Sequence, residues 1–223
     1  MTVLSHHAKL LINFSGYWHA GSGRSSGNHL DALCERDASG LPYFPGRQLK
    51  GILRHAVRRA EAWGWMDDQP LPEGPVTTHE ELLFGSASQS EARHHTFPGL
   101  LQVDSGCLPK TEGDWLAQPD KASLRAQLFD ELFSTAIKED GTAQQYSLRG
   151  IEVCIPVTLH AALGLRVTAL DLALRTQQEK WLAHAKPWSA LKISLPLIDA
   201  LGANRSRGLG EATVSLIMPK KGA

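Results

Sequence analysis

The chain has 223 residues, enough to bury a substantial core, and its composition of 42% hydrophobic and 21% charged residues is typical of a globular protein. Its 23 basic and 23 acidic side chains balance, so binding to a polyanion would need local basic patches, and no apolar run approaches the ~20 residues that span a bilayer. Three widely spaced cysteines and an N-terminus without a signal-peptide pattern predict a cytoplasmic protein with reduced thiols and no membrane partner.

The first half of the chain alternates between short regular elements and loops. Residues 9–14, KLLINF, predict a strand, and a glycine- and serine-rich loop follows over residues 16–29. After a Pro-Gly turn, apolar residues recur at helical spacing with arginines on the opposite face, which predicts a helix over about residues 47–63. The segment HEELLFGS, residues 79–86, predicts a short helix that ends at its glycine.

The second half begins with strand-like alternation over residues 97–108. The following residues are polar and poor in β-branched side chains, so we expect an insertion at about residues 109–147. Within and just after it, we expect one helix over residues 122–133 and a loop or hairpin tip over residues 138–150. A strong β run then spans residues 151–163.

Towards the C-terminus, residues 169–185 predict a helix, residues 190–202 mix helix and strand signals, and residues 211–218 predict a final strand. Strands separated by modest helices indicate an α+β protein, most simply an RRM-like or ferredoxin-like core in one domain over residues 1–223, with a glycine-rich C-terminal loop and a thumb-like insertion.

Two segments could bind anions. The glycine-rich loop, residues 201–212, contains two arginines, and glycines let backbone amides approach a phosphate closely. The predicted helix at residues 47–63 carries a basic face. Each segment also has an ordinary explanation, as a hairpin between strands and as a solvated helix face. Together they favour single-stranded RNA, for which Tyr17, Trp18, Tyr43 and Phe44 would supply stacking surfaces.

Residues suited to catalysis are few. The pair His94 and His95 with Cys107 makes a poor zinc set, and among the other histidines only His19, in the glycine-rich N-terminal loop, stands out. Asp37 fits ordinary turn chemistry. Asp31 lies close in sequence to the basic helix, where a carboxylate is unfavourable unless it holds a metal ion or moves a proton, although a surface aspartate that caps a loop remains an alternative.

Four stretches occur in the order typical of the RAMP superfamily of CRISPR-associated proteins: GSGRSSGNHLDALCERDASGLPYFPGRQLKGILR, LLFGS, SLRGIEVCIP and GANRSRGLGEA. The chain most resembles the small backbone subunits of type III effector complexes, which serve antiviral defence. The resemblance implies an RRM-like core that binds CRISPR RNA, with several copies of the subunit stacked along the guide beside other effector subunits. It implies RNA contacts from two groups of residues: Arg47, Lys50, Gly51 and Arg54 in the helix, and Asn204, Arg205, Ser206, Arg207 and Gly208 in the glycine-rich loop.

The same resemblance implies an endoribonuclease activity on target single-stranded RNA paired with the guide. Asp31 matches the aspartate before the PYxPG motif, so it is the catalytic residue that the resemblance implies, acting with Mg²⁺ as a metal ligand or as a general base. Three alternatives stay open. They are a non-cutting scaffold or capping subunit, a guide-processing endoribonuclease that uses His19 or His29, and a ferredoxin-like metabolic enzyme with a phosphorylated ligand.

Overall fold

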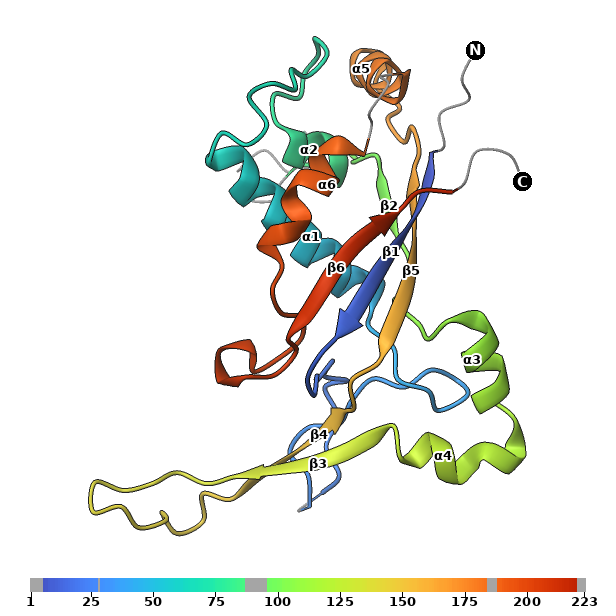
Figure 1. Ribbon diagram of the computed structural model, residues 1–223. Helices are drawn as coiled ribbons and strands as arrows, with labels where there is room; N and C mark the ends of the chain where they lie inside the picture. The colour runs from blue at the N-terminus through green and yellow to red at the C-terminus, as the bar shows by residue number, and fades with distance from the viewer. Residues whose placement is uncertain (1–5, 28, 87–95, 184–187, 220–223) are drawn as a thin grey trace.

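The computed structural model describes residues 6–27, 29–86, 96–183 and 188–219, and its centre is a four-stranded antiparallel sheet (Figure 1). Its strands are β1 (His7–Phe14), β2 (Leu101–Val103), β5 (Thr158–Leu165) and β6 (Ala212–Ile217), in the order β2-β5-β1-β6. The second, third, first and fourth core strands therefore lie side by side, with helices after the first and the third. This is the βαββαβ topology of ferredoxin-like and RRM-like folds, and it confirms the predicted α+β class.

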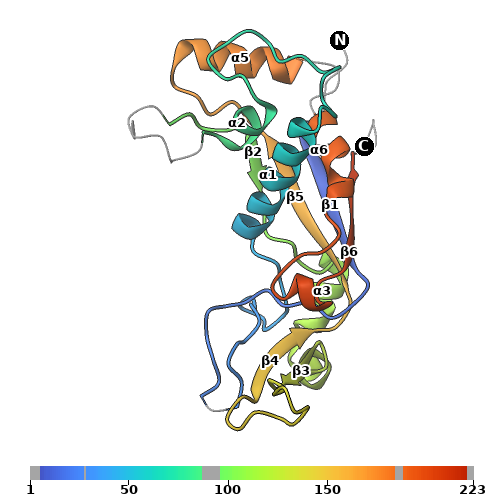
Figure 2. The same ribbon diagram turned by 90° about the vertical axis from the view of Figure 1, so that its left-hand side faces the viewer.

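The core lies between this sheet and two helices, α1 (Gly46–Ala62) and α6 (Ser189–Ser194), which cover one face of it (Figure 2). Alternate residues of β1, Leu10, Ile12 and Phe14, point into the core, as a period of two requires. The apolar stripe of α1 packs against them through Leu49, Leu53, Ala56, Val57 and Ala60. The predicted helix at residues 47–63 is confirmed to within one residue at each end.

Two further helices close the end of the sheet near the chain termini, α2 (His79–Phe84) and α5 (Leu172–Ala183). The Thr78 hydroxyl accepts the N–H of Glu81 and thereby caps α2, which ends at Gly85 as predicted. Helix α5 buries two glutamines that bond to surrounding loop backbone, Gln177 to both the N–H and the carbonyl of Val76 and Gln178 to the carbonyl of Pro98. These amides explain why α5 lacks a clean apolar stripe.

The insertion lies between β2 and β5 and carries its own small elements. They are α3 (Lys110–Leu116), the short 3-10 helix η1 (Pro119–Lys121), α4 (Ala122–Ala126), β3 (Phe129–Ser134) and β4 (Arg149–Cys154). None of residues 109–149 is buried, and the β3–β4 hairpin projects away from the core (Figure 1). The hairpin tip predicted over residues 138–150 is confirmed with shifted bounds, because residues 135–148 join the two paired strands and Arg149 and Gly150 already belong to β4.

Two predictions in this region were wrong in part. The helix expected over residues 122–133 ends at Ala126, because the next residues pair with β4 from Phe129↔Cys154 to Ser134↔Arg149. The β run expected over residues 151–163 breaks at Pro156, which has no N–H to donate to a strand ladder. Its first part, β4, pairs with the hairpin strand β3 and forms single bridges to Trp18 and Ala32 of the N-terminal loop, whereas its second part, β5, enters the central sheet.

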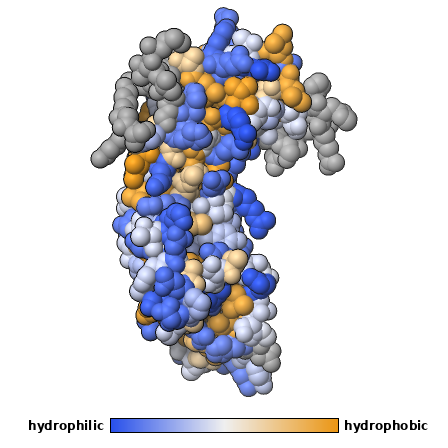
Figure 3. Space-filling model, turned by 90° about the vertical axis from the view of Figure 1, so that its right-hand side faces the viewer, coloured by the Kyte–Doolittle hydropathy of each residue, from blue (hydrophilic) through white to orange (hydrophobic). Residues whose placement is uncertain are grey.

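The sheet face turned away from α1 is open. The side chains on it are polar, small or aliphatic, and they include His7, Lys9, Leu11, Asn13, Gln102, His160, Ala162, Thr213 and Ser215. The view in Figure 3 shows hydrophilic residues over much of the middle of the molecule on that side. Among the described residues, no helix is long and apolar enough to cross a membrane.

Candidate functional site

The basic residues of α1 are largely engaged with the protein itself. Arg54 donates from Nε to Glu80 of α2 at 2.6 Å and from Nη2 to the carbonyl of Gly85 at 2.8 Å. Arg58 binds the same carboxylate through hydrogen bonds of 2.6 and 2.7 Å. Against the effect of burial, the hydrogen bonds from Arg58 and then Arg54 hold the pKa of Glu80 below its ordinary value. These pairs tie α2 to α1 and neutralise part of the charge on the helix.

The four helix residues for which the resemblance implies RNA contacts therefore fall into two groups. Lys50, like Arg54, is turned towards the protein, and its Nζ donates to the carbonyl of Leu101 at 2.9 Å. Burial, helped by the charge of Arg54, lowers the pKa of Lys50. Arg47 and Gly51 are exposed, and Arg47 has no hydrogen bond or ion pair with any other described residue. In this conformation only the exposed pair is free to meet a ligand.

The glycine-rich loop has a specific backbone structure that holds it against the N-terminal loop. The N–H of Gly210 donates to the carbonyl of Tyr17 at 2.7 Å, and the N–H of Ala203 donates to that of His19 at 2.9 Å. Gly210 has φ of 78°, and a Cβ there would lie 1.9 Å from the carbonyl oxygen of Leu201, so only glycine fits. The loop is thereby fixed relative to the core.

This backbone turns the polar tip of the loop into solvent. Asn204 adopts a left-handed conformation and begins a short 3-10 helix, η3 (Arg205–Arg207), whose residues are all exposed. Neither Arg205 nor Arg207 makes an ion pair or a side-chain hydrogen bond within the described parts of the chain. Two uncompensated guanidinium groups on a rigid turn suit the bidentate binding of phosphate oxygens.

Helix α1 and the glycine-rich loop meet around one cavity of about 470 Å³, which we call the α1 groove. Its walls are Gln48, Gly51, Ile52, His55 and Arg59 from α1 and residues 197–200, Gly202 and Arg205 from the C-terminal side. It continues into an open hollow of about 750 Å³ lined by residues 199–200 and 202–207. Arg59, Arg205 and Arg207 outweigh the one carboxylate in these walls, Asp199, so the groove favours an anionic ligand.

The groove is lined by residues from two segments that lie far apart in the sequence. Gly51 and Arg205, more than 150 positions apart in the sequence, line the same cavity. His55 was missed and Arg59 was counted only among the arginines of the basic helix face, although the two follow Gly51 at four and eight positions. That spacing was the signal that could have found them.

Asp31 lies at the root of the β3–β4 hairpin, outside the α1 groove. Its backbone N–H donates to the carbonyl of Gly150 at 2.7 Å, and its Oδ2 accepts the N–H of Gly150 at 3.1 Å. The residue is exposed, and its second carboxylate oxygen bonds to no residue that the structure describes. Two positions away, His29 pairs with Glu131 of β3 at 3.0 Å. This corner thus contains an anchored carboxylate beside an exposed imidazole–carboxylate pair.

The described residues do not form a magnesium site at Asp31. Mg²⁺ prefers six oxygen ligands and is usually held by one or two carboxylates with substrate phosphates and water. Asp31 offers one uncommitted oxygen, and within the described ranges no three His, Cys, Asp or Glu side chains are grouped so that they could hold a metal. A magnesium ion here would depend on ligands from RNA or from another subunit.

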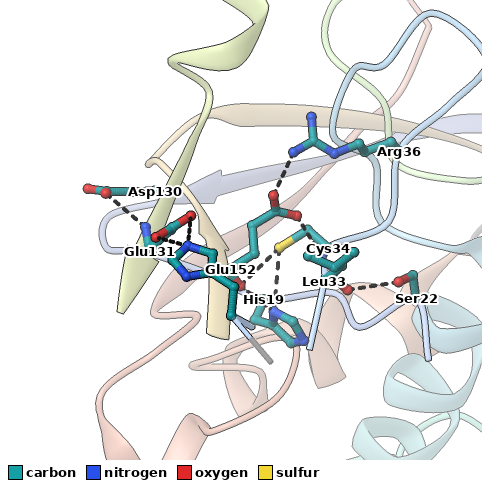
Figure 4. A network of polar contacts seen from close by, with 9 residues as sticks. His19, Ser22, Leu33, Cys34, Arg36, Asp130, Glu131 and Glu152 are labelled. Atoms are coloured by element: carbon teal, nitrogen blue, oxygen red, sulfur yellow. Dashed lines mark hydrogen bonds and ion pairs between the residues drawn. The ribbon is translucent and has the colours of Figure 1, made fainter. Parts of the chain in front are cut away.

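His19 is neither exposed nor free, which corrects the view of it as a loop histidine available for chemistry. Its ring Nδ1 lies 2.6 Å from the carbonyl of Glu152 and 3.4 Å from the Cys34 sulfur. Glu152 also accepts the backbone N–H of Cys34 and pairs with Arg36 at 2.6 Å (Figure 4). The Cys34 hydrogen bond raises the pKa of His19, against the effect of burial. This buried cluster fastens the N-terminal loop to β4. The set of His94, His95 and Cys107, judged a poor zinc site from the sequence, cannot be placed, because His94 and His95 lie outside the described residues.

The aromatic residues expected to stack on RNA are mostly part of the protein interior. Trp18 and Phe44 are fully buried and pack with Phe14, whose ring stacks on Trp18 at 4.6 Å between centroids. The hydroxyl of Tyr17 bonds to Asp130, and that of Tyr43 bonds to Glu35. The large exposed aromatic residues outside the insertion are Tyr17, Trp63 and Trp65, as far as the structure describes the chain.

Comparison with known proteins agrees with the topology. The model of the RAMP superfamily matches residues 12–213. The fold is similar to a chain in "Cryo-EM structure of the Type III-B Cmr-beta bound to cognate target RNA", with a TM-score of 0.63, 10% identity and coverage of 95% of this chain and 97% of that one. A chain in "Type IV-B CRISPR Complex" matches with a TM-score of 0.55, 15% identity and coverage of 97% and 92%. No curated protein matches the sequence.

Proposed function

Because this chain belongs to the RAMP superfamily, we propose that it is an RNA-binding backbone subunit of a multi-subunit CRISPR effector complex of type III-like organisation. In this role it binds CRISPR RNA, and its partners are further copies of itself, other effector subunits and target single-stranded RNA. Solved structures that share its fold include chains of type III-B and type IV-B CRISPR complexes, one of them bound to target RNA, which supports this class of partner.

One observation carries the proposal: α1 and the glycine-rich loop converge on a groove with excess positive charge. From Gln48 to Arg59 the helix wall extends for about 16 Å, at about 1.5 Å per residue. Arg205 and Arg207 stand at its other wall without internal partners. Contacts of this kind grip the sugar–phosphate backbone and do not read bases, as a subunit that holds guides of many sequences requires.

The test is the salt dependence of single-stranded RNA binding. Arg205→Ala and Arg207→Ala should each weaken binding for all RNA sequences and reduce the slope of log K against log salt by about 0.7. Arg175→Ala is the matched control, because Arg175 is an exposed arginine on α5 whose guanidinium pairs with Glu179 away from the groove. Unchanged slopes for both loop variants would contradict the assignment of RNA to this groove.

A second candidate activity is cleavage of target RNA at Asp31, favoured by the exposed carboxylate at the root of the projecting hairpin. In this proposal Asp31 accepts the proton of a target 2′-hydroxyl as that oxygen attacks the adjacent phosphorus, and the 5′-oxygen departs with a proton from His29 or water. Magnesium, where RNA phosphates help to hold it, would supply neutralisation of the phosphate charge. The buried state of His19 favours this reading over guide processing by that residue.

The cleavage proposal is tested in the assembled complex with Asp31→Asn. We expect loss of target cutting with unchanged RNA binding, and a 2′-deoxy substitution at the cut position should block cutting by the wild type. Asp37→Asn is the matched control, because the Asp37 carboxylate also accepts backbone N–H groups of the same loop, from Ser39 at 2.8 Å and Leu41 at 2.9 Å. If the wild-type complex leaves target RNA intact in Mg²⁺, Asp31 only anchors the loop to Gly150 and the subunit is a scaffold.

A further inference from the structure

One stripe of α1 extends beyond the groove wall. Gly51, His55, Arg59 and Trp63 follow one another at intervals of four residues, so each is a neighbour of the next on the helix surface, in a row that winds gradually around the helix axis. The first three line the α1 groove. Trp63 is the C-cap residue of the helix, and its ring centre lies 4.9 Å from the guanidinium carbon of Arg59. Trp63 therefore lies next to the Arg59 end of the groove lining.

Trp63 and Trp65 form an exposed aromatic pair at this point. Their side chains are 55% and 42% exposed, whereas Trp18, Trp181 and Trp188 are buried. The two ring centroids lie 5.6 Å apart with planes inclined at 60°, and the guanidinium of Arg59 lies 4.9 Å from the centre of the Trp63 ring. Two adjacent exposed indole rings, with a cation packed on one of them, offer a surface on which a planar ligand can stack.

The rest of the fold offers RNA bases little to stack on. RRM domains stack two or three bases on aromatic residues of the open sheet face. In this protein the described residues on that face of β1, β2, β5 and β6 include no phenylalanine, tyrosine or tryptophan. The groove itself supplies Arg59, His55 and Arg205 beside polar, aliphatic and glycine positions, which suit phosphates and sugars. Its lining also includes Phe44, but that ring is fully buried and offers no face to a base. A base-stacking surface at the end of the groove would complete the set of contacts.

We propose that Trp63 and Trp65, with Arg59 behind them, form a stacking platform that binds a base of the RNA strand leaving the α1 groove. The proposal rests on the proposed RNA-binding function and adds to it a stacking contact. This contact requires a base but does not distinguish one base from another, since every base has a π-face. The adjoining cations favour a nucleic acid over an apolar protein segment as the occupant of the platform.

The experiment compares two ligands, an oligouridylate of about 12 nucleotides and an abasic ribose–phosphate oligomer of the same length. Trp63→Ala should weaken binding of the oligouridylate by about tenfold and leave binding of the abasic oligomer unchanged. Trp63→Phe keeps a ring and should restore most of the loss. Trp115→Ala is the matched control, because Trp115 is 49% exposed and carries Lys121 5.1 Å from its ring centre but lies on the insertion, away from the groove.

Two results would overturn the platform: unchanged binding of oligouridylate by Trp63→Ala, or an equal loss for both oligomers. If the variant with unchanged RNA binding also fails to assemble with partner subunits, the pair is a protein-docking surface. Failure of the proposed function looks different, because the wild type would then bind neither oligomer and Arg205→Ala would change nothing. Thermal unfolding of both Trp63 variants establishes that they are folded.

Discussion

The substitution Glu80→Gln distinguishes a structural role for the basic face of α1 from an RNA-binding one. The Glu80 carboxylate is the shared partner of Arg54 and Arg58, with hydrogen bonds of 2.6–2.7 Å to both. The amide that replaces it keeps the shape of the side chain but carries no charge. The change therefore removes two ion pairs, leaves the packing of α2 nearly intact, and leaves both guanidinium groups without a carboxylate partner.

The expected loss of stability follows from the exposure of the three side chains. Exposed pairs contribute about 0.2–1 kcal/mol, whereas breaking a buried pair costs about 3–5 kcal/mol. Glu80 and Arg54 are 12% and 26% exposed, and Arg58 is 54% exposed, so one pair lies nearer the buried limit and the other nearer the exposed limit. Since Arg54 keeps its bond to Gly85, we expect the free energy of unfolding to fall by about 2 kcal/mol and Tm by about 4–8 °C.

The assay is thermal and urea unfolding followed by circular dichroism, with Glu179→Gln as the control. Glu179 forms an ion pair of 3.0 Å with Arg175 on α5, and both side chains are more than half exposed, so its loss should cost about 0.5 kcal/mol at most. If Glu80→Gln is no less stable than Glu179→Gln, the argument that these arginines are structural is refuted.

The pH dependence gives a second readout of the same pairs. Because Arg58 and Arg54 lower the folded-state pKa of Glu80, its stabilising contribution is complete above the unfolded-state pKa of about 4.3. That contribution disappears as the pH falls through the lower folded-state pKa. Wild-type protein should therefore lose stability on acidification below about pH 5 more steeply than Glu80→Gln does.

RNA binding by the same variant answers the functional question. If Arg54 and Arg58 reach phosphates once they are released, Glu80→Gln should bind single-stranded RNA more tightly and steepen the salt slope by about 0.7 for each phosphate gained. If binding and slope stay unchanged while stability falls, the two arginines serve the fold alone, and phosphates are bound by the glycine-rich loop and Arg59.

Three further expectations concern the glycine-rich loop, a thiol and the insertion. Gly210→Ala should destabilise the protein to urea by about 3 kcal/mol, because its Cβ would meet the carbonyl of Leu201, whereas Gly208→Ala, with φ of 85° in open space, should cost only about 1 kcal/mol. Cys107 is exposed and the other two cysteines are buried, so mass spectrometry should find it alkylated first. Its rate should rise with pH as the thiolate forms, at higher pH than for an ordinary thiol, because partial burial and nearby carboxylates raise the pKa of Cys107. Within the insertion, trypsin should cut first after Lys138 in the exposed hairpin loop, and earlier cutting within α4 would contradict the ordered structure of that helix.

Local patterns in the sequence were enough to predict the helices and strands whose apolar side chains recur at one regular spacing. The apolar spacing of α1 and the alternation in β1 depend on residues within a turn or two of each other, so both elements could be predicted with nearly correct ends. The order of short motifs likewise indicated the family and the ferredoxin-like core. Asp37 as a turn residue also followed from local chemistry, since its carboxylate accepts two nearby backbone N–H groups.

Tertiary structure decided everything that depends on a distant partner. Residues 129–134 carry no strong strand signal, yet they are a strand because β4 pairs with them. Arg54 resembles a free cation in the sequence, but Glu80, 26 positions away, neutralises it. His19 lies in a loop composition typical of exposed residues, and it is buried because Glu152 and Cys34 close over it. Strand pairing, side-chain burial and charge neutralisation depend on which segments come into contact in the folded chain. Those contacts join residues far apart in the sequence, so a local sequence pattern cannot predict them.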